Sequence, residues 1–289
     1  MRKTLFLTFI FSILFFNSVS ASDVPGDLKE KLEEIGLEDH LIQNLSEEQI
    51  IQIEQANLDE LRVADVELKK AGKTRVTEDG EIIEEEYDAN TYELMQNDVF
   101  SARSNGNIEN LDLTLSALQL SNSEFIVFAN YEWDPAPFFQ HRDLLVVNWP
   151  STSYLRTPED GNGGVRDFTA HDFSWSGTSS TGSCTNTGYE LYNETFRPFD
   201  VEPGSGIAHR IDLPGVLGFP GNNCRFMGSM SFPVVQDPVT SSTIQMKLEY
   251  GHATAQINPS ISYGGGGGSF SVNSTWSTDI DWVLYDIHR

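Results

Sequence analysis

The stretch Leu111-Asp112-Leu113-Thr114-Leu115-Ser116 decides the fold class of this chain, because apolar and polar residues alternate along it. Successive side chains of a β-strand point to opposite faces, so this pattern predicts a strand with one buried and one solvated face. Two further candidates follow. Residues 124–133 are rich in aromatic and β-branched residues, and residues 144–149 form a short apolar run.

Strand patterns continue to the end of the chain. Turn residues separate most of the further candidates, at residues 206–213, 226–235, 243–250, 255–263, 269–276 and 280–287. No helix-length periodic segment lies between them, which argues against parallel βαβ units. Residues 150–203, which include Gly-, Ser- and Thr-rich stretches, are expected to be largely irregular. We therefore predict a mainly β domain over residues 101–289, an antiparallel β-sandwich or barrel.

Residues 22–100 differ from this domain in charge and pattern. They hold 23 acidic and 7 basic residues, against 20 and 9 in residues 101–289. Helical spacing predicts short helices over residues 25–72, including one that begins near Asn57 and ends at Gly72. We interpret residues 22–100 as an acidic helical segment and linker. The sequence leaves open whether it is removed as a propeptide.

Two local signals refine this segment. Ser46-Glu47-Glu48-Gln49 has the form of a helix capping box. The acidic run within residues 77–88 predicts a solvated linker or an exposed hairpin around Asp79-Gly80. Calcium binding is the less favoured alternative, because the ligand spacing of a calcium loop is missing.

The first 21 residues are typical of a secretory signal peptide. Arg2 and Lys3 precede a mostly apolar stretch at residues 5–16, and Val19-Ser20-Ala21 has small residues where a signal peptidase cuts. We expect cleavage after Ala21 and an extracellular protein. An uncleaved anchor is the less favoured alternative, and no other apolar run is long enough to span a membrane.

The net charge limits the classes of binding partner, and the cysteine content predicts a disulfide. The formal net charge is -25 and becomes -27 without Arg2 and Lys3, so nucleic acids and anionic lipids are excluded as expected partners. Cys184 and Cys224 are the two cysteines. In an oxidising compartment they are expected to form a disulfide, and a metal pair is disfavoured because no ligand spacing supports one. We expect no metal and no cofactor.

No motif identifies catalytic residues. The six histidines form no metal-ligand pair, and no serine-hydrolase elbow is present. His141 and His171 each lie within two residues of an aspartate, but neighbours along a strand point to opposite faces. We assign no catalytic residue and keep a hydrolase with a site assembled by the fold as an alternative.

Five consecutive glycines, Gly264 to Gly268, separate two arms in which apolar and polar residues alternate. Each arm has about the 9–11 residues that a membrane-spanning β-strand needs, and the hairpin resembles the insertion segments of β-pore-forming toxins. An ordinary sandwich hairpin has the same alternation with its apolar side on the core. The candidate insertion residues within 254–278 are Ile257, Ile261, Tyr263, Phe270, Val272 and Trp276.

Aromatic residues gather near residues 131–149. Trp133, Phe138, Phe139 and Trp149 are candidates for a carbohydrate-stacking shelf. The alternative is that such residues close one end of the sandwich core.

The motifs Tyr131-Glu132-Trp133, Asp143 to Trp149 and Gly264 to Val272 are similar to uncharacterised secreted proteins of Gram-positive bacteria. This resemblance covers residues 108–289 and implies a compartment and a fold but no activity. The leading hypothesis is a non-enzymatic extracellular protein that binds a glycan, a cell wall or a protein. A membrane-active protein with an insertion hairpin and a secreted hydrolase are the alternatives. We expect no stable membrane anchor, and the sequence does not indicate an oligomeric state.

Overall fold

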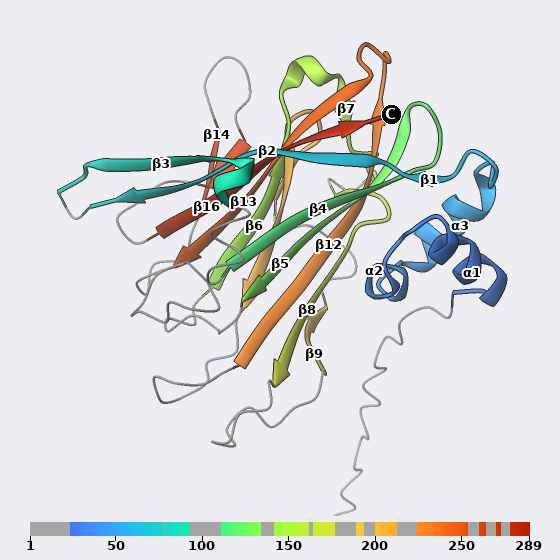
Figure 1. The fold of residues 1–289 in the computed structure, drawn as a ribbon, viewed down its shortest axis with the longest axis horizontal. Coiled ribbons are helices and arrows are strands. Elements are labelled where there is room, and N and C mark those ends of the chain that lie inside the picture. Colours follow the sequence, from blue (N-terminus) through green and yellow to red (C-terminus); the bar gives the residue numbers. More distant parts are fainter. Residues whose placement is uncertain are drawn as a thin grey trace, which may run out of the picture.

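The computed structural model describes residues 24–77, 79–92, 111–133, 142–161, 164–176, 189–193, 200–212, 224–253, 260–263, 270–272 and 278–289. Over these ranges the chain forms two antiparallel sheets that pack face to face (Figure 1). The predicted β-sandwich is therefore confirmed. No helix in the described part of the chain is long and apolar enough to cross a membrane. The predicted signal residues 1–21 lie outside the described residues.

The first sheet, sheet A, has the strand order β1-β4-β5-β12-β8-β9, and β7 also pairs with β12. The predicted strands at residues 124–133 and 226–235 correspond to β5 and β12. The strands of sheet A are β1 (Arg62–Val63), β4 (Leu111–Gln119), β5 (Glu124–Trp133), β7 (Leu155–Arg156), β8 (Thr169–Ser176), β9 (Tyr189–Asn193) and β12 (Cys224–Gln236).

The second sheet, sheet B, has the strand order β10-β11-β6-β13-β16-β2-β3. Its strands are β2 (Asp65–Val76), β3 (Ile82–Asp88), β6 (Arg142–Asn148), β10 (Asp200–Glu202), β11 (Gly206–Asp212), β13 (Thr243–Ala253) and β16 (Thr278–His288). A separate two-stranded sheet consists of β14 (Ile261–Tyr263) and β15 (Phe270–Val272), and a 3-10 turn η1 (Ser151–Ser153) follows β6.

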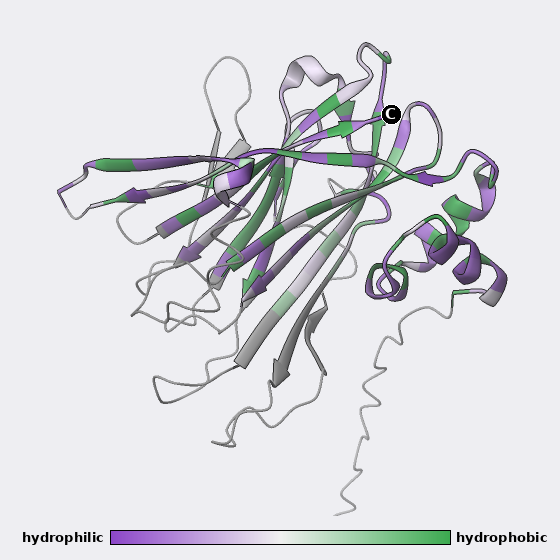
Figure 2. Ribbon diagram, viewed as in Figure 1, coloured by the Kyte–Doolittle hydropathy of each residue, from purple (hydrophilic) through white to green (hydrophobic). Residues whose placement is uncertain are grey.

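The main core lies between the two sheets and explains the alternating sequence pattern. Leu111, Leu113 and Leu115 of β4 are buried in this core, whereas Asp112 and Thr114 between them are exposed. The same alternation of apolar and polar residues is visible along the strands in Figure 2. Burial of one face of each sheet therefore stabilises the sandwich.

Three helices cover part of the outer face of sheet A, at the right of Figure 1. They are α1 (Gly26–Glu34), α2 (Asp39–Gln43) and α3 (Glu47–Gln55). The predicted capping box at the start of α3 is confirmed, because the Ser46 and Gln49 side chains bond each other's backbone N–H. The sheet residues under the helices are Leu118, Leu120, Ile126 and Phe128.

A buried glutamine joins these helices to the sandwich by hydrogen bonds. The Gln49 side chain is fully buried and donates to the Asp167 carbonyl and to the Ser231 hydroxyl, each at 2.9 Å. Thr169 lies 2.6 Å from the same hydroxyl and donates to the backbone of Asn44. The helices are thus docked on sheet A by apolar and polar contacts together.

The predicted helix from Asn57 to Gly72 is wrong, because this part of the chain forms β1 and most of β2. Leu61 and Leu68 are seven residues apart, a spacing that a helix permits, but Val66 and Leu68 follow the two-residue period of a strand. Pairing of β2 with β16 from Asp65 to Thr74 decides between the two periods. The predicted boundary near residue 100 lies outside the described residues, and strands from both sides of it share both sheets.

Two other local predictions have opposite outcomes. The hairpin around Asp79-Gly80 is confirmed as the β2–β3 hairpin, which projects to the left in Figure 1. The irregular interpretation of residues 150–203 is wrong in part, because β7, β8, β9 and β10 lie within it. The abundance of Gly, Ser and Thr there concealed the alternation of residues 169–176, and strand pairing with β12 overrides the weak propensity.

Gly72 is required by the packing of its neighbours. A Cβ atom there would lie 2.4 Å from a ring carbon of Trp282 and 2.5 Å from the Glu85 carbonyl oxygen. We expect Gly72→Ala to lower the free energy of unfolding by about 1–3 kcal/mol, because a backbone atom has to move. Urea denaturation measures this loss. Gly204→Ala is the matched control, since a Cβ at Gly204 meets nothing within 4 Å, and an equal loss there would contradict the steric argument.

Candidate functional site

The most distinctive feature of sheet B is an insertion between two adjacent strands. β13 and β16 pair directly along their whole length, from Thr243 with His288 to Ala253 with Thr278. Residues 254–277, here called the excursion, connect these two paired strands, and the structure describes residues 260–263 and 270–272 of them. The excursion contributes no strand to sheet A or sheet B within its described part.

The described part of the excursion is the predicted hairpin. β14 and β15 are antiparallel, and the register pairs Ile261 with Val272, Ser262 with Ser271, and Tyr263 with Phe270. Apolar positions are thus opposite apolar positions, and serine is opposite serine. This register preserves the two-faced pattern that the sequence indicated.

Val272 fixes the hairpin against the sandwich. Its side chain is buried on the outer face of sheet B, the face opposite the main core. β15 contacts β6, β11 and β13 of this sheet. The apolar cluster around Val272 consists of Leu144, Val146, Ala208 and Ile280.

One carboxylate adds a polar anchor to this contact. The backbone N–H of Val272 donates to Glu249 Oε2 at 2.9 Å, and Glu249 is almost fully buried. Lys247 Nζ lies 2.5 Å from the other carboxylate oxygen of Glu249. The same ammonium group lies 4.7 Å from the centre of the Trp282 ring. Lys247 therefore pairs with the carboxylate that accepts the hydrogen bond from the hairpin backbone.

The structure places one of the six candidate insertion residues in full. Val272 is buried as described above. Ile261, Tyr263 and Phe270 lie in β14 and β15, but their side chains are not among the described ones. Ile257 and Trp276 lie outside the described residues.

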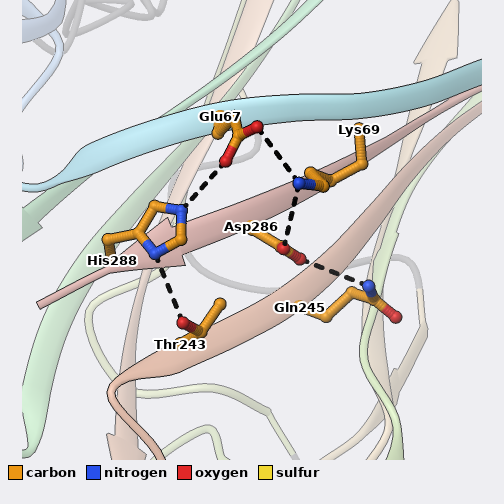
Figure 3. Close-up of polar contacts among 6 residues, drawn as sticks. All are labelled: Glu67, Lys69, Thr243, Gln245, Asp286 and His288. Atoms are coloured by element: carbon orange, nitrogen blue, oxygen red, sulfur yellow. Dashed lines mark hydrogen bonds and ion pairs between the residues drawn. The ribbon is translucent and has the colours of Figure 1, made fainter. Parts of the chain in front are cut away.

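The opposite end of the β13, β16 and β2 strands carries a polar network (Figure 3). Gln245 donates to Asp286 at 3.2 Å, and Lys69 lies 3.9 Å from the same carboxylate. His288 lies 3.2 Å from Thr243 and 3.3 Å from Glu67. These exposed or partly exposed contacts are far weaker than buried ones. They supply control positions for tests of the hairpin.

A second feature lies at the base of the excursion, inside the sandwich. Asp143 of β6 is fully buried, accepts a hydrogen bond from the Tyr250 hydroxyl at 2.8 Å, and lies 2.9 Å from His252 Nδ1. Trp133 donates to the same tyrosine oxygen at 3.1 Å. Burial, reinforced by the Asp143 charge, raises the pKa of Tyr250 well above its ordinary value. These groups satisfy one another in the interior, so they form a structural network in the described part of the chain.

Charged side chains of β16 and β2 extend this network. Asp279 lies opposite His252 in the β13–β16 register, and Arg75 Nε lies 3.9 Å from Asp279 Oδ2. Asp281 lies opposite Tyr250 on one side and Lys73 on the other. Burial raises the pKa of Asp281 to about 7, although the nearby Lys73 and Arg75 oppose this shift. An ordinary surface carboxyl would be ionised at that pH.

Sequence patterns alone could not identify the residues of this network. His252 and Asp143 are separated by 109 positions and meet only because β6 and β13 are neighbours. His141, whose proximity to Asp143 in sequence we considered, lies outside the described residues. His171 lies in β8, but its side chain is not among the described ones.

The predicted aromatic shelf needs correction. Trp133 and Trp149 are only 1% and 2% exposed, so neither ring can stack on an external sugar. Trp133 belongs to the core, and Trp149 donates to the Leu155 carbonyl there. The two indoles close the interior because their N–H groups find partners in it. Phe138 and Phe139 lie outside the described residues.

Cys184 lies outside the described residues, and the side chain of Cys224 is not among the described ones, so the disulfide stays a prediction. Among the described residues no group of three or more His, Cys, Asp and Glu side chains is arranged to hold a metal ion.

Comparisons with known proteins do not identify a family. No family model and no curated protein matches the sequence. Among solved structures, the chain is similar to AvmM, which catalyses macrocyclization in alchivemycin A biosynthesis. The two are 16% identical, and the match covers 56% of this chain and 86% of that chain with a TM-score of 0.21. A likeness at that score carries no argument about function.

Proposed function

We propose that this chain is an exported, membrane-active protein and that the excursion is its membrane-inserting hairpin. The observation that carries the proposal is that β13, which precedes the excursion, pairs directly with β16, which follows it. Because the sheet is complete without residues 254–277, this segment can leave the sandwich while both sheets stay intact.

The described contacts of the excursion support a hairpin that is held reversibly on the outer face of sheet B. They bury Val272 on a small apolar cluster, and one buried carboxylate, Glu249, accepts a hydrogen bond from the Val272 backbone. A hairpin with one apolar and one Ser/Thr/Asn-rich side needs an apolar surface in water and can exchange that surface for lipid. Release of the hairpin loses little compared with unfolding of the main core.

Export and charge fit the same function. The signal-like residues 1–21 would deliver the protein outside the cell, where a Cys184–Cys224 disulfide would form. A net charge of -27 for the cleaved chain repels anionic lipids, because like charges raise the free energy of approach. The expected target is therefore a neutral or zwitterionic bilayer.

Release of a trapped dye from zwitterionic liposomes tests the proposal. The assay uses secreted protein whose intact mass shows a chain beginning at Ser22. In one variant Asn-Gly replaces residues 254–277, a two-residue turn that can join Ala253 to Thr278 because these residues are paired. We expect the wild-type protein to release dye. The variant should keep its β-rich circular dichroism spectrum and lose the release.

A point variant guards against misfolding of the shortened chain. Glu249→Ala removes the acceptor for the Val272 N–H and should increase the rate of release several-fold. Asp286→Ala, on the neighbouring strand β16 at the other end of the sheet, is the matched control and should leave the rate unchanged. Failure of the wild-type protein to release dye from neutral, zwitterionic and anionic liposomes between pH 5 and 9 would refute the function.

A further inference from the structure

The two strand ends from which the excursion leaves carry a row of alternating charge. From β6 to β2 the row consists of Asp143, His252, Asp279 and Arg75. His252 and Asp279 lie one position from Ala253 and Thr278, where the β13–β16 pairing ends. The row therefore lies at the two strand ends to which the excursion is joined.

Behind the row lies a buried carboxyl group of β16, that of Asp281. Asp281 is 8% exposed, and its Oδ2 atom has no hydrogen-bond partner among the described residues. It is flanked by Tyr250 on β13 and by Lys73 on β2. An ionised carboxylate in such a place costs free energy, whereas a protonated one costs much less.

We propose that this row and Asp281 form a pH-dependent latch at the base of the excursion, which is closed in mildly acidic solution and opens as the pH rises. The inference rests on the proposed function for its purpose, since the latch would control when the hairpin can leave. Its physical basis is the geometry of the row, which can be tested without any membrane.

Protonation of three groups in the latch, Asp281, Asp279 and His252, favours the closed state. Burial raises the pKa of Asp281 to about 7 and also raises that of Asp279. Burial alone would lower the pKa of His252, but attraction to Asp143 and their hydrogen bond outweigh it, so the pKa of His252 is raised. The closed latch thus binds protons more tightly than the open one at three positions.

The remaining groups near Asp281 do not reverse this direction. Lys73 and Arg75 of β2 attract its ionised form, and that effect is already opposed by burial. On β3, Tyr87 is hydrogen-bonded to Glu85, and burial together with this contact raises the pKa of Tyr87 to about 12, so it stays neutral. From sheet A, Tyr131 packs against Tyr250 with ring centres 5.3 Å apart.

The sign of the pH effect follows from proton linkage. Opening releases protons, so a rise in pH favours opening. For Asp281 the change spans the interval between its ordinary pKa near 4 and its value of about 7 in the closed latch. For His252 the closed latch is favoured below the ordinary pKa near 6.5 and loses this advantage as the pH passes its raised value.

Hydrogen exchange of the full chain, read by mass spectrometry, tests the latch. After correction for the intrinsic exchange rate, the opening equilibrium of residues 249–253 and 278–283 should rise at least tenfold between pH 5.5 and 8.5. Residues 124–133 of sheet A serve as an internal reference. Asp281→Asn, which cannot ionise, should reduce the rise to under about threefold, since it removes the largest shift.

Asp286→Asn, on the outer face of the same strand, is the matched control and should retain the wild-type rise. The latch would be overturned if the opening equilibrium of the wild-type protein stayed constant or fell as the pH rises. It would also be overturned if the opening equilibrium of Asp281→Asn rose with pH as much as that of the wild type. These readouts are independent of dye release. If opening depends on pH but no dye is released, the latch is supported and the membrane function is overturned. If dye is released but opening does not depend on pH, the membrane function is supported and the latch is overturned.

Discussion

A chain that begins at residue 101 is expected to be insoluble or unfolded, although the sequence suggested that residues 22–100 form a separate segment. Such a chain lacks β2, which pairs with β16 from Ile280 to His288, and so exposes the edge of a long central strand. It also lacks the helices that cover Leu118, Leu120, Ile126 and Phe128.

The size of the effect follows from the buried surface. Complete burial of one large apolar side chain contributes about 1.5–3 kcal/mol. Exposure of four such side chains of sheet A therefore approaches the roughly 5–15 kcal/mol that stabilises a whole domain. Size-exclusion chromatography and thermal unfolding followed by circular dichroism should show aggregation and no cooperative transition.

A cut chain is the matched control for the shortened one. A protease site placed between residues 100 and 101 leaves all strands present, so the two fragments should stay associated after cleavage. If residues 101–289 alone gave a soluble monomer with a cooperative transition, residues 22–100 would be dispensable, as a removable propeptide requires.

The fold class could be predicted because strands with one buried face leave a two-residue period in the sequence. The period was strong in β4, where Leu111, Leu113 and Leu115 of the main core alternate with polar residues. It was weak in β8, where Ser and Thr are mixed with the aromatic residues, and ambiguous around the start of β2, where Leu61 before the strand and Leu68 within it also fitted a helix. Only the pairing with β16 and β12 resolves these two strands.

The candidate site was predictable only where it is local. The hairpin at residues 261–272 was found because its two arms and its glycines are continuous in sequence. Its partner Glu249 gave no signal, since a single acidic residue in a strand usually faces solvent. The pairing of Asp143 with His252 depends on the order of strands in sheet B, which alternation does not determine.

Removal of Asp143 is expected to have the largest effect of any single substitution at the base of the excursion. Asp143→Ala leaves the buried Tyr250 hydroxyl and His252 ring without their shared acceptor. Loss of one partner from a buried charged pair costs about 3–5 kcal/mol. Urea denaturation should show a lower midpoint with an unchanged slope. Asp286→Ala removes partly exposed contacts and should cost less than about 1 kcal/mol.

The pH dependence of this loss identifies its cause. The pKa of His252 is raised in the folded protein, so the pair with Asp143 stabilises the fold fully below pH 6.5 and less as the pH rises through the folded value. The difference in unfolding free energy between wild type and Asp143→Ala should therefore be larger at pH 5.5 than at pH 9. A difference that is constant over this range would mean that Asp143 acts only through hydrogen bonds to uncharged partners, the Tyr250 hydroxyl and the neutral His252 ring. A difference below about 1 kcal/mol at both pH values would mean that the buried network contributes little to the stability of the strands that hold the excursion.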